Sequence, residues 1–146
     1  MDAPTCPEMC GPMRRDSRPM SLTYKEYSLE AMMPGWYCEC CDQSIHTGED
    51  MKYSDRTLNR LKARAEGLLE PEDIRRIRKR IGLTQAAAGD LIGGGPRAFQ
   101  KYESGDLLPS RAISSALLLL DQQPNLILCL KGSKRTVSPT KGSFKA

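Results

Sequence analysis

Cysteines are the residues whose type and spacing point most directly to chemistry in this sequence. Three residues separate Cys6 from Cys10 and two separate Cys38 from Cys41, so each pair can wrap a short turn around one ion. Two such pairs supply the four thiolates of a tetrahedral structural zinc site. The first residues do not predict a secretion signal, so disulfide bonds are less expected than metal binding. The sequence therefore predicts one structural Zn²⁺ per chain.

Three further residues leave alternatives open. Cys40 could replace Cys41 as a ligand, and His46 could substitute for a cysteine, although a single histidine near a turn is more often solvated. Cys129 lies far away on an apolar stretch and is expected to be a small buried hydrophobic residue. Unconnected reduced cysteines, or a redox-active C-x-x-C, are the competing interpretations of the whole set. Four thiolate ligands would leave no open position, so the site is expected to stabilise the fold and not to catalyse.

A second pattern, in the C-terminal half, is typical of a helix-turn-helix. Thr84 is placed to cap one helix, and Gln85 in its first turn is placed to donate to a phosphate. Phe99 and Tyr102, spaced i, i+3, would pack the next helix onto the core. The pattern predicts binding of double-stranded DNA.

The side chains expected to face DNA follow from that packing. They are Arg97, Gln100 and Lys101 on the second helix of the motif, and Ser110 and Arg111 at the start of the next helix. Arg97 and Lys101 suit the O6 and N7 acceptors of guanine, whereas Ser110 and Arg111 are placed for phosphate. The alternative is an ordinary helical domain with solvated charges. Most of the basic run at 75–80 is expected to be such a solvated face.

The elements that must position the cysteines are expected within residues 1–66. A short strand at 21–27 and a partner at 32–37 would carry one cysteine pair to the other. A helix then begins after Thr47 with acidic residues in its first turn. Its predicted apolar stripe consists of Met51, Leu58, Leu61, Ala65 and Leu68. Gly67 and Pro71 place a linker at 67–70.

The elements that must position the DNA contacts are expected within residues 71–130. Ile74, Ile77 and Ile81 share one face of the first helix, which stops at Gly82. Three more helices are predicted to begin at Thr84, Pro96 and Pro109, and a final apolar turn covers 125–130. The predicted fold class is thus an α+β zinc-knuckle domain, with short strands and one helix, followed by an all-α five-helix repressor-like helix-turn-helix domain. A basic tail at 131–146 is predicted to be disordered.

The distribution of charge also separates residues 1–66 from residues 71–130. The chain has 146 residues and a net charge of +4, yet residues 1–66 carry nine basic and eleven acidic side chains, a net −2. Residues 71–130 have a net charge of +2, and the tail adds five basic groups. An acidic unit joined to a basic one suggests two different partners. No apolar stretch approaches the length of a membrane helix, so no membrane partner is expected.

The combination of two cysteine pairs, a connecting helix and a repressor-like helix-turn-helix resembles the MqsA family of bacterial type II antitoxins. The resemblance covers about residues 6–130. Its most specific parts are Cys6-Pro7, Tyr37 to Cys41, Leu83-Thr84-Gln85, Gly93-Gly94-Gly95, Ala98-Phe99, Tyr102-Glu103, and Leu120-Asp121 before Pro124.

This resemblance implies that the zinc domain binds and neutralises a cognate toxin, commonly an mRNA-cleaving ribonuclease. It also implies that the C-terminal domain dimerises and binds a palindromic operator in its own promoter, with Arg97 and Lys101 where the family reads bases. The sequence departs from the family pattern in three places. The first knuckle has three intervening residues instead of two, Arg97 replaces a more typical amide side chain, and the tail after Leu130 lies outside the pattern.

Dimerisation through residues 71–130 is also expected from the residues themselves. One helix-turn-helix buries too little surface for specific DNA binding, and two-fold dimers reading two half-sites solve this problem. The apolar residues that exceed the needs of one small core are Leu107, Leu108, Leu118 and Leu119.

Two other functions compete with an antitoxin. One is a free-standing zinc-ribbon transcription regulator without a toxin. An adjacent gene that encodes a small basic protein would argue against this alternative. The other is an enzyme with catalytic zinc or a nucleophilic cysteine, which is disfavoured by a single histidine and a closed metal site. We expect a non-enzymatic cytoplasmic protein of bacteria, associated with the nucleoid when bound to DNA.

Overall fold

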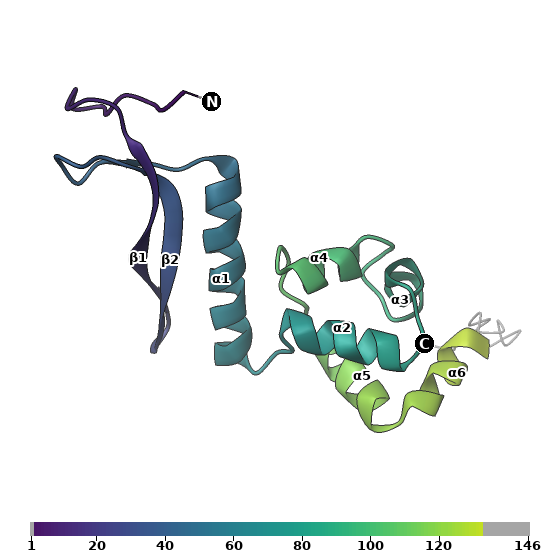
Figure 1. Ribbon diagram of the computed structural model, residues 1–146. Coiled ribbons are helices and arrows are strands. Elements are labelled where there is room, and N and C mark those ends of the chain that lie inside the picture. Colours follow the sequence, from purple (N-terminus) through teal and green to yellow (C-terminus); the bar gives the residue numbers. More distant parts are fainter. Residues whose placement is uncertain (1, 133–146) are drawn as a thin grey trace, which may run out of the picture.

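A long antiparallel hairpin forms the N-terminal part of the computed structural model, which describes residues 2–132 (Figure 1). Strands β1 (Arg14–Tyr24) and β2 (Tyr27–Tyr37) pair along their whole length, and a short β3 (Ser44–Ile45) pairs with the end of β2. The turn between β1 and β2 is tight, with Lys25 in a left-handed conformation at φ 52°. The sheet order is β1-β2-β3, so β1 is an edge strand.

This hairpin corrects the strands expected at 21–27 and 32–37. The turn lies at residues 25–26, inside the first predicted strand, and both strands are eleven residues long. The reason is that β1 is half-buried only at alternate positions, on the face that meets the following helix. A strand that buries one face so weakly carries little apolar signal in its sequence.

Helix α1 (Gly48–Glu66) begins and ends where the local signals predict. Thr47 is its N-cap and forms a capping box with Asp50, whose side chain accepts from the Thr47 amide at 2.8 Å. Gly67 ends the helix in the left-handed region at φ 68°. Capping residues contact only their immediate neighbours in the chain, so they can be predicted from the sequence.

The apolar stripe predicted on α1 is buried only in part. Leu61 is buried as expected and Ala63 is also buried, whereas Met51 is 45% exposed. Asp50 turns inward in its place and receives both guanidinium nitrogens of Arg15, at 2.8 and 2.9 Å. The expectation for Met51 was therefore wrong because an ion pair, not an apolar contact, closes this end of the helix.

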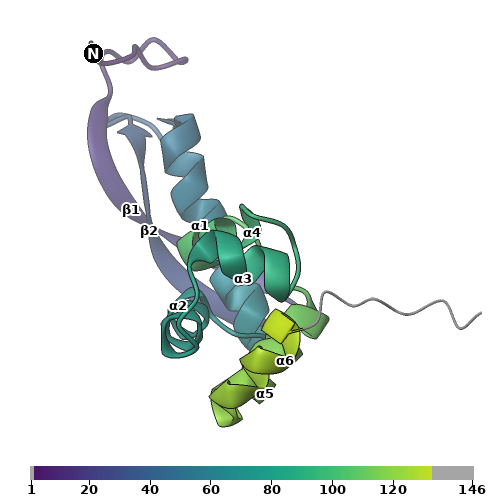
Figure 2. The ribbon, with the colours of Figure 1, turned by 90° about the vertical axis from the view of Figure 1, so that its right-hand side faces the viewer.

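The C-terminal part consists of short helices around one core. The helices are α2 (Pro71–Arg80), α3 (Gln85–Leu91), α4 (Ala98–Ser104), α5 (Arg111–Gln122), the 3₁₀ turn η1 (Pro124–Leu126) and α6 (Ile127–Gly132). Ile74, Ile77, Phe99 and Leu117 are fully buried at its centre. Helix α1 lies between the hairpin and this helical unit (Figure 1, Figure 2). The predicted fold class, a small α+β domain followed by a helical one, is confirmed.

The turn that joins α3 to α4 brings the two helices unusually close. An ideal Cβ on Gly89 would lie 1.8 Å from the carbonyl oxygen of Gly95, and Gly95 donates to Gly89 O at 3.2 Å. Helix α4 begins at Ala98, with Arg97 as its N-cap, and not at Pro96 as predicted. Three consecutive glycines, 93–95, all have positive φ, which side chains rarely tolerate.

The end of the chain differs slightly from the predicted boundary. Lys131 and Gly132, expected in the tail, belong to α6, and the rest of the predicted basic tail lies outside the described residues. Among the residues described, no single helix is both long and apolar enough to cross a membrane. One pair, Arg111–Gln122 with Pro124–Gly132, reaches that length and composition only across a bend of 119°.

Candidate metal centre and nucleic-acid interface

The four cysteines predicted as ligands meet at one end of the hairpin. The sulfurs of Cys6, Cys10, Cys38 and Cys41 all lie within 4.8 Å of one another. The Cys6–Cys41 and Cys10–Cys41 sulfur distances are 3.5 and 3.7 Å. Zn–S bonds of about 2.3 Å place tetrahedral sulfurs about 3.8 Å apart, so this cluster has the right size for one zinc ion. A site suited to one structural Zn²⁺ is thus confirmed.

The first knuckle accommodates its extra residue through a left-handed turn. Met9 has φ 60° and donates its amide to Cys6 O at 2.8 Å, and the Cys6 amide donates to Gly11 O at 2.9 Å. The unusual three-residue spacing therefore still returns Cys10 to the cluster. In the second knuckle the Cys38 amide donates to Gln43 O at 3.0 Å.

The clustered thiols shift one another's pKa values in opposite directions. The backbone amide of Cys40 donates to Cys38 Sγ at 3.4 Å and lowers the pKa of the Cys38 thiol from 9.0 to about 7. The hydrogen bond to Cys41 raises the pKa of Cys10 to about 12. One thiolate among its neighbours therefore opposes further ionisation, and a divalent cation supplies the charge that lets all four sulfurs act as thiolates.

Little apolar material surrounds the cluster. Its buried hydrophobic residues are only Cys6, Met13 and Cys38, with Trp36 and Ile45 packed alongside. Such a core contributes too little burial to hold two loops in place, and a structural metal compensates for that deficit.

The other sulfur and imidazole groups take different places. Cys40 is exposed and outside the cluster, so Cys41 is the fourth member. His46 Nδ1 donates to Pro34 O at 2.9 Å, its Nε2 contacts Ser44 Oγ at 3.1 Å, and the ring packs edge-on against Tyr37. Cys129 is exposed, which corrects the expectation of a buried residue. Ile127 is the residue of α6 that enters the core, and two positions along a helix turn a side chain to the opposite face.

The predicted DNA-reading side chains lie together on an outward surface. Arg97, Gln100 and Lys101 are exposed at the start and on the open side of α4. Phe99 and Tyr102 point the other way and form an edge-to-face pair with ring centroids 5.5 Å apart in the core. The hydrophobic face of α4 thus fixes which residues face out, and the arrangement suits a recognition helix.

The residues that flank α4 are also positioned by capping. Thr84 accepts from the Ala87 amide at 3.1 Å and Ser110 from the Ile113 amide at 3.2 Å, and Gln85 begins α3. Arg111 is exposed but donates to the carbonyl oxygen of Glu66 at 2.6 Å. One of its five donors is therefore engaged with the end of α1.

Sequence reasoning missed a buried ion pair between α2 and α4. Arg78 makes two hydrogen bonds to Glu103, both at 2.8 Å, and a third to Leu83 O at 3.0 Å. The Glu103 carboxylate holds the pKa of Arg78 above its ordinary value. Arg76 and Arg80 contact Asp121 of α5 but stay more than half exposed, so most of the basic run is a solvated face, as expected.

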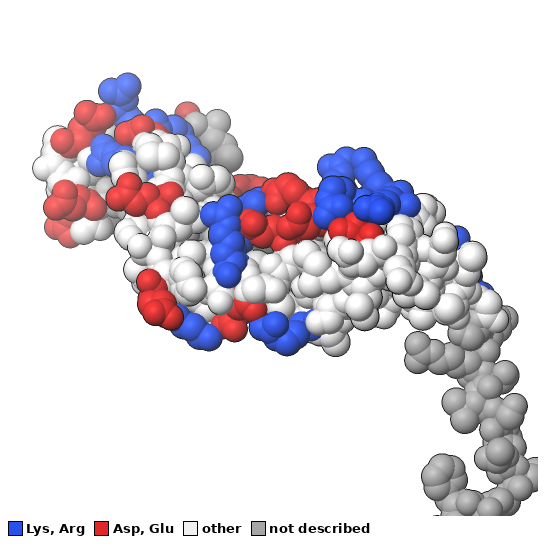
Figure 3. All heavy atoms as spheres, turned by 90° about the horizontal axis from the view of Figure 1, so that it is seen from below, with Lys and Arg blue, Asp and Glu red and all other residues white. Residues whose placement is uncertain are grey.

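Charge on the helical unit is unevenly distributed. In Figure 3 the largest group of basic side chains lies along the upper edge of the view, over the right-hand half of the molecule, and a broad uncharged surface covers much of the rest of that half. Leu118, Leu119, Leu126 and Leu128 are all exposed, Leu119 to 66%. Of the leucines expected to exceed the core, Leu107 is exposed as well, while Leu108 is half-buried.

Comparison with known proteins agrees with this two-part arrangement. A family model described as the antitoxin component of bacterial toxin-antitoxin system, MqsA, matches residues 1–131. Antitoxin MqsA of Escherichia coli (strain K12) is 38% identical over 97 residues, which cover 64% of this chain and 72% of that relative. The chain belongs to the MqsA antitoxin family. The resemblance predicted from the sequence is confirmed.

Membership defines the general role of this MqsA-family chain. It is an antitoxin of the MqsA type, and membership implies a cognate toxin as its partner and a regulatory role. The free-standing regulator without a toxin is not favoured. The cysteine cluster fits the zinc site expected of the family.

Proposed function

We propose that this antitoxin neutralises a toxin through its zinc domain and represses its own operon through its helical domain. The observation that carries the proposal is the outward cluster of Arg97, Gln100 and Lys101 on a recognition-type helix, joined to a separate zinc-type unit. The helical domain would bind a palindromic operator as a dimer, because one such helix contacts too few base pairs for specific binding. The toxin is proposed to be an mRNA-cleaving ribonuclease.

Each predicted DNA contact has a place in this proposal. Arg97 and Lys101 would read guanine edges in the major groove, with Gln100 between them. Thr84, Gln85, Ser110 and Arg111 would contact phosphates on either side. Arg111 retains free donors for a phosphate while one nitrogen contacts Glu66 O.

The outer face of the hairpin supports a protein partner for residues 1–66. Helix α1 covers one face of the sheet, and no described helix or strand covers the middle of the other (Figure 1). Met32, 48% exposed, lies across from Pro19 on that face. Nearer the cysteine cluster the same face carries Arg15 and the half-buried Trp36, with the guanidinium 5.3 Å from the indole centroid. An exposed apolar side chain close to an arginine and an aromatic ring is typical of a protein interface.

Exposed leucines on α5 and α6 support the dimer. Leu118 and Leu119 are exposed on the far side of α5 from the core residues Leu117 and Leu120, and Leu128 is exposed on α6. Several large apolar side chains exposed on neighbouring elements often mark a protein interface.

Co-expression with the product of the adjacent gene tests the toxin assignment. We expect the two proteins to co-purify and the toxin's growth arrest to be relieved. The variant Met32→Ala should weaken co-purification, because Met32 is exposed and outside the core around the cysteines, while Arg97→Ala should not. Stable co-purification without relief of growth arrest would contradict neutralisation. Binding of the purified chain to operator DNA, compared with a scrambled duplex, independently tests the proposed repression of its own operon.

A further inference from the structure

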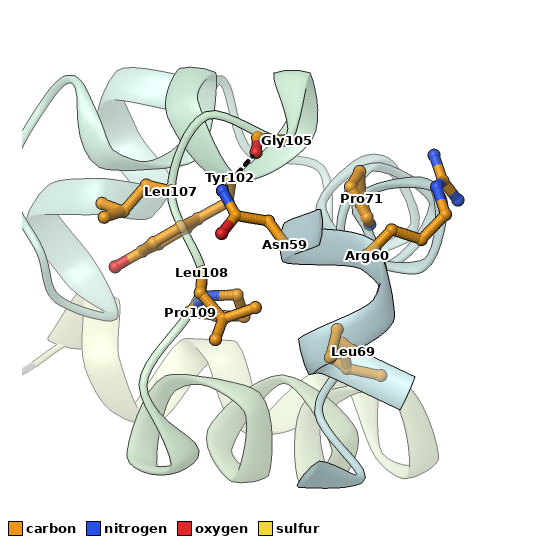
Figure 4. Close-up of a pocket in the computed structure, with 10 residues that line it drawn as sticks. Asn59, Arg60, Leu69, Pro71, Tyr102, Gly105, Leu107, Leu108 and Pro109 are labelled. Carbon is orange, nitrogen blue, oxygen red and sulfur yellow. Dashed lines mark hydrogen bonds between the residues drawn. The ribbon is translucent and has the colours of Figure 1, made fainter. Parts of the chain in front are cut away.

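We infer that α1, although part of the zinc domain and without DNA-facing residues of its own, positions the recognition helix α4. The inference rests on the proposed operator binding, and it concerns Arg56 and Asn59 as positioning residues. Both contact the loop that leaves α4. Figure 4 shows Asn59 with its hydrogen bond to Gly105.

The contacts fall directly at the C-terminal end of α4. Asn59 Nδ2 donates to the carbonyl oxygen of Gly105 at 2.8 Å. Arg56 Nε and Nη2 donate to the two carboxylate oxygens of Asp106, at 2.7 and 3.2 Å. Gly105 is the left-handed C-cap of α4, and its amide donates to the carbonyl of Lys101, one of the predicted base-reading residues, at 3.1 Å. A chain of two hydrogen bonds thus joins α1 to Lys101.

Helix α1 also packs closely against the loop that leaves α4. An ideal Cβ on Gly105 would lie 3.4 Å from Arg56 Cβ and Cγ, so α1 packs against the backbone of the cap itself. Figure 4 shows Leu69 on the α1 side opposite Leu108 and Pro109 of the loop, around a small apolar hollow that Ala63 also lines. Further along, Leu69 N donates to Ser114 Oγ at 3.0 Å and so fixes the end of α1 to α5.

Helix α4 depends on contacts at both ends because it is short. It has seven residues, fewer than an isolated helix requires for stability. Its N-terminal end follows a turn that contains three glycines, 93–95, and that is packed closely against Gly89 of α3. A contact at the C-terminal cap fixes the second end of α4 and, with it, the direction of Arg97 and Lys101.

The expected effect is on positioning rather than on stability. Arg56 and Asp106 are each more than 40% exposed, and ion pairs of that kind contribute little to folding. Removing them should leave the unfolding transition of the helical unit nearly unchanged. It should instead loosen α4, raise the amide exchange rates of Gly105 and Leu107, and weaken binding to the operator.

The experiment uses the zinc-loaded full chain and compares Arg56→Ala and Asn59→Ala with Lys62→Ala. Lys62 is a basic residue on the same helix, and its ammonium lies 5.7 Å from the ring centroid of Tyr24 in the hairpin. We expect about a fivefold loss of operator affinity for each of the first two variants, and wild-type affinity for Lys62→Ala. Toxin co-purification should be unchanged in all three.

A charge exchange separates positioning from a general electrostatic effect. Arg56→Asp alone should lose affinity, and Arg56→Asp with Asp106→Arg should recover operator affinity without gaining affinity for a scrambled duplex. Wild-type amide exchange at Gly105 and Leu107 in both alanine variants would overturn the inference, as would failure of the exchanged pair to recover. A wild-type chain that binds no operator would refute the proposed function, and the exchange rates would still decide whether α1 holds α4.

Discussion

At the scale of single residues, the four clustered sulfurs dominate what the N-terminal unit needs in order to fold. Cys38→Ser should reduce bound zinc to well below one equivalent and unfold residues 1–66, because few apolar groups surround the cluster. The helical unit should stay folded around its own core. Metal analysis and circular dichroism measure both effects. Cys40→Ser is the matched control, since Cys40 lies outside the cluster, and full zinc retention by Cys38→Ser would contradict the assigned ligand set.

Asp50 is the second residue on which this unit depends. It accepts from Arg15 and from the Thr47 amide, and these hydrogen bonds hold the pKa of its carboxyl well below the ordinary range. Asp50→Ala should lower the free energy of unfolding by about 1–3 kcal/mol at pH 7. Glu49→Ala, at an exposed position one residue earlier, should change it by less than about 0.5 kcal/mol.

The pH dependence of that effect has a definite sign. A carboxyl with a lowered pKa in the folded state contributes stability that is present above its unfolded pKa of about 3.9 and is lost as the pH falls towards the folded value. The difference between wild type and Asp50→Ala should therefore be constant from neutral pH down to about 5 and shrink below about 4. Denaturant unfolding at several pH values measures it, and a difference that grew on acidification would contradict the ion pair.

At the scale of elements, α3 and α4 are held by a close backbone approach. Gly89→Ala should cost about 1–3 kcal/mol, because its Cβ would collide with the carbonyl of Gly95 and the backbone would have to move. Gly48→Ala, where nothing lies within 4 Å of the added Cβ, should be tolerated. Thermal unfolding of the two variants distinguishes them, and equal stability would mean that the turn adapts freely.

The recognition helix allows base reading to be separated from phosphate binding. Arg97→Ala should cost about 1–3 kcal/mol of operator affinity and relax discrimination at one base pair per half-site. Arg111→Ala should weaken all sequences alike and flatten the salt dependence. Operator and scrambled duplexes titrated over a range of salt concentrations measure both. An equal loss on the two duplexes for Arg97→Ala would make Arg97 a phosphate contact.

What could be predicted from the sequence at this scale depended on how local the interactions are. The caps at Thr47, Gly67 and Gly105 act within one turn, and the paired cysteines carry a spacing pattern, so both were predicted. The hairpin register was not, because it depends on packing against α1. The Asn59–Gly105 contact joins residues 46 positions apart, and no local pattern reports such a pair.

At the scale of the whole molecule, the zinc unit and the helical unit are linked by polar contacts between α1 and its neighbours. Arg60 contacts Glu70 and Glu72, and Arg64 contacts Glu70, so the segment at 67–70 is bracketed by ion pairs. Like the contacts of Arg56 and Asn59, they join α1 to the residues that follow it in the chain. The zinc unit is therefore placed against the part of the helical unit that carries α4. We expect loss of zinc to weaken binding to the proposed operator as well as binding to the toxin.

The last expectation concerns two copies of the chain. Leu119 is 66% exposed and Leu128 64%, and burying such groups between two chains would contribute about 1.5–3 kcal/mol per side chain. Leu119→Glu with Leu128→Glu should therefore convert the dimer to a monomer, because two like charges would meet across a two-fold axis. Sedimentation at micromolar concentration measures the mass. Met51→Glu, at a 45% exposed position on α1, is the control and should stay dimeric. A wild-type chain that sediments as a monomer would contradict this surface as the dimer contact. A double variant that stays dimeric would move the interface elsewhere on the helical unit.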